Sequence, residues 1–177
     1  MTDLRILALL GTSRSDGNTR KVLDATVQGM GSSTRIMDLQ TLALQPYDYD
    51  QNYSDDTFLH LAAEMAESDL ILFATPVYWY AMSAQMKVLF DRLSDLLGTH
   101  KALGRALAGR KTAMIATGTD ADLPDGFEVP FQRTSTYFDM DYLGALYMPE
   151  GKSAESEAVR ADRIRQFQSL LTADYQD

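Results

Sequence analysis

The chain has 177 residues, of which 45% are hydrophobic, so it is long and apolar enough to bury the core of an ordinary globular domain. Its 25 acidic and 16 basic residues give a net charge of −9, which argues against a binder of duplex nucleic acid, because such proteins present a basic surface. The absence of cysteine excludes disulfides, thiol nucleophiles, and zinc or iron–sulfur sites held by thiolates.

Apolar runs of strand length alternate with segments of helical period along the whole chain. In chain order, the pattern predicts a strand at 5–10, a helix at 18–30, a strand at 34–39, a helix at 56–67 and a strand at 69–74. It then predicts a helix at 82–97, a strand at 111–116, an irregular start followed by a helix within 125–138, a strand at 142–148 and a helix at 153–173. The polar segment 40–56, which contains Pro46, is expected to be a loop.

Five strands that alternate with five helices indicate an α/β fold. The strands at 5–10, 69–74 and 111–116 are apolar throughout, which is typical of a parallel sheet covered by helices on both faces. In such folds the crossovers are right-handed, and ligands bind at the carboxyl ends of the strands where the strand order reverses. No repeat or linker interrupts the pattern, so we expect a single domain over residues 1–177.

The sequence shows no pattern typical of a targeting signal. No apolar run approaches the ~20 residues that a membrane span needs, and the first residues lack the charged and apolar regions of a signal peptide. We therefore expect a cytoplasmic protein with no membrane partner.

A loop rich in hydrogen-bond donors follows the first predicted strand. It reads GTSRSDGNT from Gly11 to Thr19 and leads directly into the first predicted helix. The unpaired N–H groups and partial positive charge of a helix N-terminus favour a phosphate. A simple helix cap would need only one or two of the polar residues. We infer a phosphate site formed by Ser13, Arg14, Ser15, Gly17, Asn18 and Thr19.

Other phosphate and metal motifs do not fit. The pattern GxxxxGK[ST] is excluded because Gly17 is followed by Asn18, and the sequence Gly29-Met30-Gly31 is better explained as the stop signal of a helix than as a dinucleotide-binding loop. The acidic segment that begins at Asp48 lacks the glycine and the final glutamate of a calcium loop. We expect no metal site.

Two more loops are predicted at the same edge of the sheet. The third strand is followed by Pro76, Val77, Tyr78, Trp79 and Tyr80, whose aromatic rings and backbone amides suit a flat heterocycle. Packing against other loops or a partner subunit explains these aromatic residues equally well when the loop is taken alone. The fourth strand is followed by a small polar turn, which allows close approach to a ring or is an ordinary turn: Thr117, Gly118 and Thr119.

The segments GTSRSDGNTRK and TPVYWYAMSAQMKVLFDRL, with the order of strands and helices, resemble the NAD(P)H-dependent FMN reductase group of flavodoxin-like flavoproteins. The resemblance implies a flavodoxin-like three-layer sandwich, with a five-stranded parallel sheet of order 2-1-3-4-5 and helices on both faces. It implies FMN as cofactor and NAD(P)H as co-substrate. Hydride would pass from the nicotinamide to the bound flavin and then to a small acceptor, such as a quinone or a flavin, without a catalytic acid or base.

The same resemblance assigns roles to individual residues. It implies that the FMN phosphate is held by the first loop, through Ser13, Arg14, Ser15, Asn18 and Thr19. The isoalloxazine ring would be flanked by the second loop, through Pro76, Val77, Tyr78 and Trp79. The third loop would lie near the ring, with Thr117, Gly118 and Thr119. Many members carry Asn-Gly where this chain has Trp79-Tyr80, and the iron–sulfur members of the wider group carry a cysteine cluster that this chain lacks.

The sequence leaves alternatives open for both the oligomeric state and the activity. The resemblance implies a homodimer or homotetramer, and Lys87 and Asp91, four residues apart on a predicted helix, form either a surface ion pair or part of a subunit contact. A flavodoxin-type electron carrier, whose acidic surface would dock onto a basic protein, is one alternative to a reductase. A binding module that holds FMN without turnover is the other.

Overall fold

The computed structural model describes residues 4–30, 33–54 and 56–175. Five strands form one parallel sheet: β1 (Arg5–Leu10), β2 (Ser33–Asp38), β3 (Leu70–Pro76), β4 (Lys111–Gly118) and β5 (Asp141–Pro149). Their order is β2-β1-β3-β4-β5, which confirms the expected flavodoxin-like topology. The described residues also form six α-helices, namely α1 (Asn18–Val27), α2 (Phe58–Glu67), α3 (Ala84–Arg92), α4 (Lys101–Arg105), α5 (Val129–Tyr137) and α6 (Glu157–Thr172).

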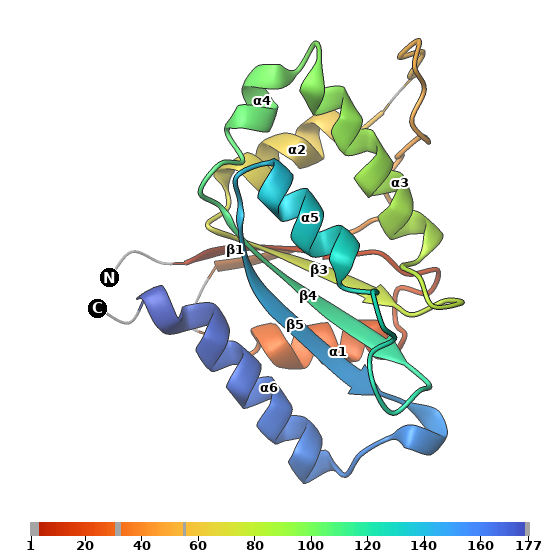
Figure 1. Cartoon of the computed structure of the whole chain (residues 1–177), viewed down its shortest axis with the longest axis vertical. Helices are drawn as coiled ribbons and strands as arrows, with labels where there is room; N and C mark the ends of the chain where they lie inside the picture. The colour runs from red at the N-terminus through yellow and green to blue at the C-terminus, as the bar shows by residue number, and fades with distance from the viewer. Residues whose placement is uncertain (1–3, 31–32, 55, 176–177) are drawn as a thin grey trace.

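The sheet separates two hydrophobic cores, because successive side chains of a strand point to opposite faces. In β1, Leu7 and Leu9 join a core that α2, α3 and α5 cover, whereas Ile6, Ala8 and Leu10 join a core that α1 and α6 cover. Figure 1 shows the resulting three layers, with α2 to α5 on one side of the sheet and α1 and α6 on the other. Burial on both faces explains why β1, β3 and β4 are apolar along their length.

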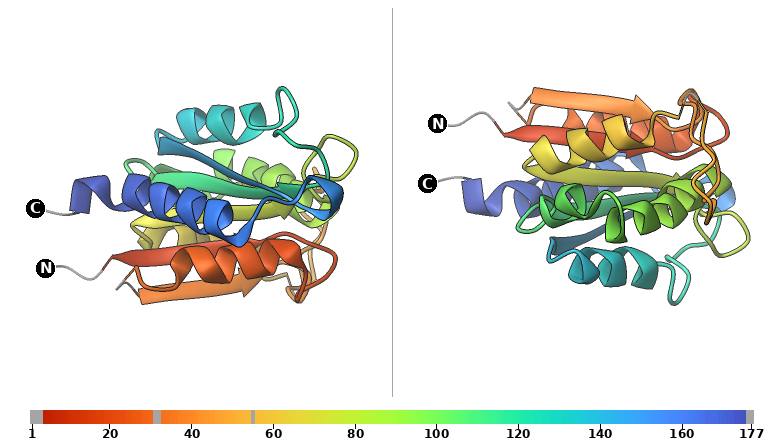
Figure 2. Two further views of the ribbon diagram at one scale, coloured as in Figure 1. Left: turned by 90° about the horizontal axis from the view of Figure 1, so that it is seen from below. Right: turned by 90° about the horizontal axis from the view of Figure 1, so that it is seen from above.

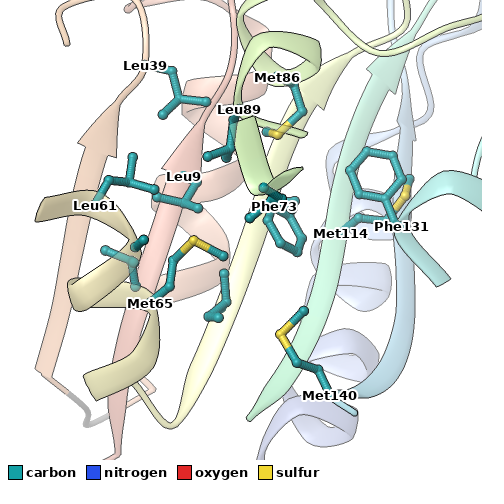
Figure 3. Close-up of a cluster of buried hydrophobic side chains, with 14 of the residues drawn as sticks. Leu9, Leu39, Leu61, Met65, Phe73, Met86, Leu89, Met114, Phe131 and Met140 are labelled. Atoms are coloured by element: carbon teal, nitrogen blue, oxygen red, sulfur yellow. The ribbon is translucent and has the colours of Figure 1, made fainter. Parts of the chain in front are cut away.

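The larger core fixes the helices that lead away from the carboxyl ends of β3 and β4. Met86 and Leu89 of α3 and Phe131 of α5 are fully buried against the sheet (Figure 3). Phe73 of β3 lies 5.9 Å from the Phe131 ring, measured between centroids. Full burial of each such side chain stabilises the fold by roughly 1.5–3 kcal/mol. The loops after β3 and β4 are therefore attached to firmly packed helices.

The expected strands are all present, whereas several helix boundaries differ from the prediction. The segment expected to be one helix over 82–97 consists of α3 followed by a 3-10 helix, η1 (Leu93–Leu97), and α4 was not expected. The first helix ends three residues early, at Val27, and Gly29 follows with a φ of +82°, a conformation that glycine adopts readily. Gly31, the last residue of the predicted stop signal, lies outside the described residues.

A side-chain cap and a proline determine where α6 and α5 begin. The last helix does not start at 153. A short 3-10 turn, η2 (Gly151–Ser153), comes first, and the Ser156 side chain then caps α6 by accepting a hydrogen bond from the Val159 N–H. Residues 125–128 form turns, as expected of an irregular start, but Pro130 lies within the first turn of α5, where its missing N–H is not needed.

The long segment between β2 and α2 contains no helix or strand over the described residues 39–54 and 56–57. Arg92 of α3 anchors it: the guanidinium ion-pairs with Asp56 and donates from Nη1 to the Gln45 carbonyl oxygen over 3.0 Å. Its Nε also donates to Asp95 of η1 over 2.8 Å, and its centre lies 3.7 Å above the Tyr53 ring. The buried guanidinium therefore holds in place a segment that has no helix or strand of its own.

Among the described residues, no helix is both long enough and apolar enough to cross a membrane.

Candidate functional site

Three loops converge at the carboxyl ends of β1, β3 and β4, where the strand order reverses between β1 and β3. Figure 2 shows the strand arrows pointing toward this common end of the molecule. A cavity of about 220 Å³ opens here, and its wall is formed by Thr12, Arg14, Gly17, Asn18, Thr19, Pro76, Val77, Tyr78, Thr117, Gly118, Thr119 and Glu150. The fold therefore unites segments that lie about a hundred residues apart in the sequence.

The first loop presents the N-terminus of α1 without a side-chain cap. Gly17 is the N-cap residue, in an extended conformation, and no side chain accepts a capping hydrogen bond in this described part of the chain. The Arg14 guanidinium lies nearby, is 73% exposed, and approaches Asp16 only to 3.8 Å. A Cβ atom at Gly17 would lie 3.2 Å from the Arg14 carbonyl oxygen. Donor N–H groups and a loosely paired cation thus meet at one point, which suits an anion.

Hydrogen bonds tie the three loops to one another. The buried hydroxyls of Thr19 and Thr117 lie 2.8 Å apart and join the start of α1 to the end of β4. The hydroxyls of Ser13 and Tyr78 lie 3.0 Å apart and join the first loop to the second. The Val77 N–H donates to the Thr117 carbonyl oxygen over 2.8 Å. The cavity wall is therefore one connected unit.

The third loop is closely packed at Gly118, which leaves little room for a side chain there. A Cβ atom at Gly118 would lie 2.7 Å from the Tyr147 hydroxyl oxygen and 3.2 Å from the Val77 Cβ. The Tyr147 hydroxyl donates to the Asp120 carbonyl oxygen over 2.8 Å. Beyond β5, the Glu150 N–H donates to the Gly118 carbonyl oxygen, and its carboxylate pairs with Arg160 over 2.8 Å. Backbone rather than side-chain atoms therefore form the wall at this point.

An acidic environment surrounds the Tyr147 hydroxyl. Burial raises its pKa most, and the negative charges of Asp120, Asp122 and Glu150 raise it further. Three carboxylates therefore act on the hydroxyl that lies against Gly118.

Most of the residues predicted from the sequence line the cavity: Arg14, Gly17, Asn18, Thr19, Pro76, Val77, Tyr78, Thr117, Gly118 and Thr119. The lining does not include Ser13, Ser15 or Trp79. Ser13 instead contacts Tyr78, and the Trp79 side chain is 93% exposed. Whether these three residues contact a ligand stays a prediction.

Sequence reasoning missed two residues of the wall, Thr12 and Glu150. Thr12 lies inside the donor-rich loop and could have been included on that ground. Glu150 follows β5 directly, so the rule that ligands bind at the carboxyl ends of parallel strands was the available signal.

The wall suits a phosphorylated flat ligand. A guanidinium, hydroxyls, an amide and uncapped N–H groups gather at its α1 end, and a proline, an aliphatic side chain and a close-packed glycine lie at the other end. In the described residues, no group of three or more His, Cys, Asp or Glu side chains is arranged to hold a metal ion. The chemistry of the donors therefore fits FMN.

A larger cavity of about 420 Å³ lies elsewhere, between η1, α4 and the end of α5. Its wall includes Lys101, Arg105 and Asp139. The chain runs from α4 and from Asp139 into the amino ends of β4 and β5, which is the opposite end of the sheet from the three loops. Ligands of such folds bind at the carboxyl ends of the strands, so the loop cavity is the stronger candidate.

Comparisons with known proteins agree with this assignment. The family model described as NADPH-dependent FMN reductase matches residues 4–159. The protein YwqN of Bacillus subtilis (strain 168), which is named as an NAD(P)H-dependent FMN-containing oxidoreductase, is 29% identical over 96% of this chain and 94% of its own length. An iron–sulfur flavoprotein of Archaeoglobus fulgidus is 26% identical over 51% of this chain and 46% of its own length.

Solved structures share the fold at lower sequence identity. A flavodoxin from Streptococcus pneumonia TIGR4 is 17% identical, with a TM-score of 0.63 over 96% of this chain and 98% of its own. A flavone reductase is also 17% identical, with a TM-score of 0.73 over 98% of this chain and 65% of its own. Because the family model covers most of the chain, from residue 4 to residue 159, this protein belongs to the NADPH-dependent FMN reductase family and is an NAD(P)H-dependent oxidoreductase with FMN as its cofactor.

Proposed function

We propose that the enzyme holds FMN in the loop cavity and passes reducing equivalents from NAD(P)H to a small acceptor such as a quinone or a flavin. The observation that carries the proposal is the meeting of an uncapped helix N-terminus with two further loops at the reversal of strand order. The phosphate would be held by Arg14, Gly17, Asn18 and Thr19, and the ring by Pro76, Val77, Tyr78, Thr117, Gly118 and Thr119.

The residues of the chain bind and orient, while FMN supplies the hydride and electron chemistry when it is bound. The Thr19–Thr117 and Ser13–Tyr78 hydrogen bonds fix the distance between the phosphate end and the ring end of the cavity. The Glu150 carboxylate is already engaged by Arg160. No side-chain acid or base is therefore assigned to the reaction.

We also propose that residues 1–177 form a single FMN-binding domain that assembles as a homodimer or homotetramer in the cytoplasm. Exposed apolar side chains on η1 and α5, with Leu97 45% and Tyr137 66% exposed, favour an assembly. The Lys87–Asp91 pair is formed within α3, as an exposed ion pair. Light scattering of the purified protein measures the assembly directly.

An absorbance spectrum of the purified, FMN-loaded protein under anaerobic conditions tests the reaction. We expect the visible flavin band to be bleached within seconds after NADPH or NADH is added. A yellow protein that neither nucleotide bleaches would support the flavodoxin-type carrier instead. A colourless protein that takes up no FMN would show that the cofactor site is wrong.

A further inference from the structure

The tip of the second loop is a two-residue turn formed by Trp79 and Tyr80. The flanking residues exchange both backbone hydrogen bonds, from the Tyr78 N–H to the Ala81 oxygen over 2.9 Å and from the Ala81 N–H to the Tyr78 oxygen over 3.1 Å. The φ angles are +48° at Trp79 and +64° at Tyr80. Turns of this kind strongly prefer Asn-Gly, because a bulky L side chain is strained at positive φ. This chain therefore holds two aromatic residues where the backbone disfavours them.

Neither of these aromatic side chains gains packing that would offset the strain. Trp79 is 93% exposed and Tyr80 69% exposed. A large apolar side chain in water contributes nothing to the core, so stability does not explain the choice of residues. Backbone strain that the fold does not repay is found mainly at functional sites.

The turn is continuous with the wall of the loop cavity. Tyr78 starts the turn and also lines the cavity, and its hydroxyl lies 3.0 Å from the Ser13 hydroxyl on the opposite loop. The exposed rings of Trp79 and Tyr80 therefore stand next to the cavity, outside its wall. A second substrate that enters the cavity past Tyr78 would meet this turn.

The negative charge near Gly118 indicates which class of substrate suits the turn. Val77 of the aromatic loop and the Tyr147 hydroxyl both lie against Gly118, and the charges of Asp120, Asp122 and Glu150 act on that hydroxyl. Glu150 is paired with Arg160, and the other two carboxylates are exposed. The whole chain carries a net charge of −9. Negative groups on a substrate would be repelled, whereas an uncharged ring would not.

We propose that Trp79 and Tyr80 are specificity-determining residues that stack an uncharged planar aromatic acceptor, of the quinone class, at the mouth of the cavity. The inference rests on the proposed function and assigns these residues to the acceptor. In the net reaction NAD(P)H gives up two electrons and one proton as hydride, and water supplies a second proton. The quinone takes up both electrons and both protons and leaves as hydroquinone, while NAD(P)⁺ leaves as the oxidised product.

The double variant Trp79→Asn/Tyr80→Gly tests the proposal in the FMN-loaded enzyme. The measured quantity is kcat/KM for a neutral naphthoquinone divided by kcat/KM for ferricyanide, which needs no stacking. We expect this ratio to fall about fivefold or more, since an aromatic stack is worth roughly 0.5–1.5 kcal/mol for each of the two rings. The control Trp79→Phe/Tyr80→Phe keeps both aromatic faces and should keep most of the ratio.

The folding of the double variant is checked in the same experiment. Because Asn-Gly suits the turn, the urea concentration at the unfolding midpoint should rise, so a lower ratio cannot be attributed to a less stable protein. An unchanged ratio in the Asn-Gly variant would overturn the proposal. An unchanged ratio together with a changed mass in light scattering would assign the turn to a subunit contact, and would overturn it too.

Fluorescence gives a readout that does not depend on turnover, because Trp79 is the single tryptophan of the chain. A neutral naphthoquinone should quench its emission in the FMN-loaded protein along a saturating curve. The sulfonated counterpart should quench it only linearly, as it quenches free N-acetyltryptophanamide. Linear quenching by both compounds would contradict the proposal.

Failure of the proposed function has a different signature. The wild-type protein would then take up no FMN, or its flavin band would not be bleached by NAD(P)H. Saturable quenching of Trp79 and the acceptor ratio are read separately from both of these results.

Discussion

Arg14 supplies the positive charge of the first loop, and its position makes a quantitative prediction possible. Its guanidinium is 73% exposed and is only loosely paired with Asp16 at 3.8 Å, so a phosphate would be a better partner. We expect Arg14→Ala to weaken FMN about fivefold, corresponding to about 1 kcal/mol for an exposed charged contact. Riboflavin, which lacks the phosphate, should bind as before. Flavin fluorescence titration measures both affinities.

The control for Arg14 is Arg35→Ala. Arg35 lies in β2 and pairs with Glu64, so its replacement removes the same charge far from the loop cavity. An equal loss of affinity for FMN and riboflavin in Arg14→Ala would contradict a phosphate contact.

Asp56 links folding to pH. Burial acts to raise its pKa, but hydrogen bonds from Arg92 and from the Phe58 and Gln45 N–H groups outweigh burial and lower the pKa below its usual value. The unfolded chain therefore binds this proton more tightly. The contribution of Asp56 to stability is complete above the unfolded-state pKa of about 3.9 and is lost as the pH falls through the folded-state value.

Urea unfolding at a series of pH values measures this effect. The free energy of unfolding of the wild-type protein should decrease below about pH 4, and Asp56→Asn should show a shallower decrease over the same range, from a lower stability at neutral pH. If the free energy of unfolding falls equally steeply in the two proteins, another carboxylate causes the loss of stability in acid.

At the scale of the elements, Arg92 connects α3, η1 and the long segment that precedes α2. Its side chain is 2% exposed and forms ion pairs with Asp56 and Asp95. Arg92→Ala would leave both carboxylates without their buried cation, and we expect a loss of about 3–5 kcal/mol in the free energy of unfolding. Chemical denaturation followed by circular dichroism measures the loss.

Arg20→Ala is the matched control for Arg92, because Arg20 pairs with Asp24 on the surface of α1 over 2.8 Å. That pair should contribute less than about 0.5 kcal/mol. Similar losses in the two variants would mean that burial does not set the strength of the Arg92 network.

The elements differ in how well the sequence predicts them. The strands β1, β3 and β4 were identified because their apolar runs are continuous, as burial on both faces requires. The junction of α3 and η1 was missed because buried positions recur across it, at Leu89, Leu93 and Leu96, so the period shows no break. The turn at Trp79 and Tyr80 was missed because neither residue favours positive φ, and turn rules depend on the residues that do.

At the scale of the whole molecule, the net charge of −9 and the carboxylates near the cavity should affect the rate with charged acceptors. We expect kcat/KM for ferricyanide, an anion, to rise several-fold between low salt and roughly 0.1 M salt, because screening weakens repulsion beyond a Debye length of about 10 Å. A neutral naphthoquinone should change less than about twofold. A rate with ferricyanide that falls with salt would contradict a negative field at the cavity.

The sequence by itself determined the class of fold, the strands, the donor-rich loop and the family resemblance, since these depend on local period, turn chemistry and short motifs. The comparisons confirm the family and the flavodoxin-like fold. Only the tertiary structure decided which residues share the cavity, because the carboxyl ends of β1, β3 and β4 meet through pairing between strands distant in the sequence. It brought Thr12 and Glu150 into the wall and left Trp79 in solvent, since packing and backbone conformation, rather than residue type, determine where a side chain points.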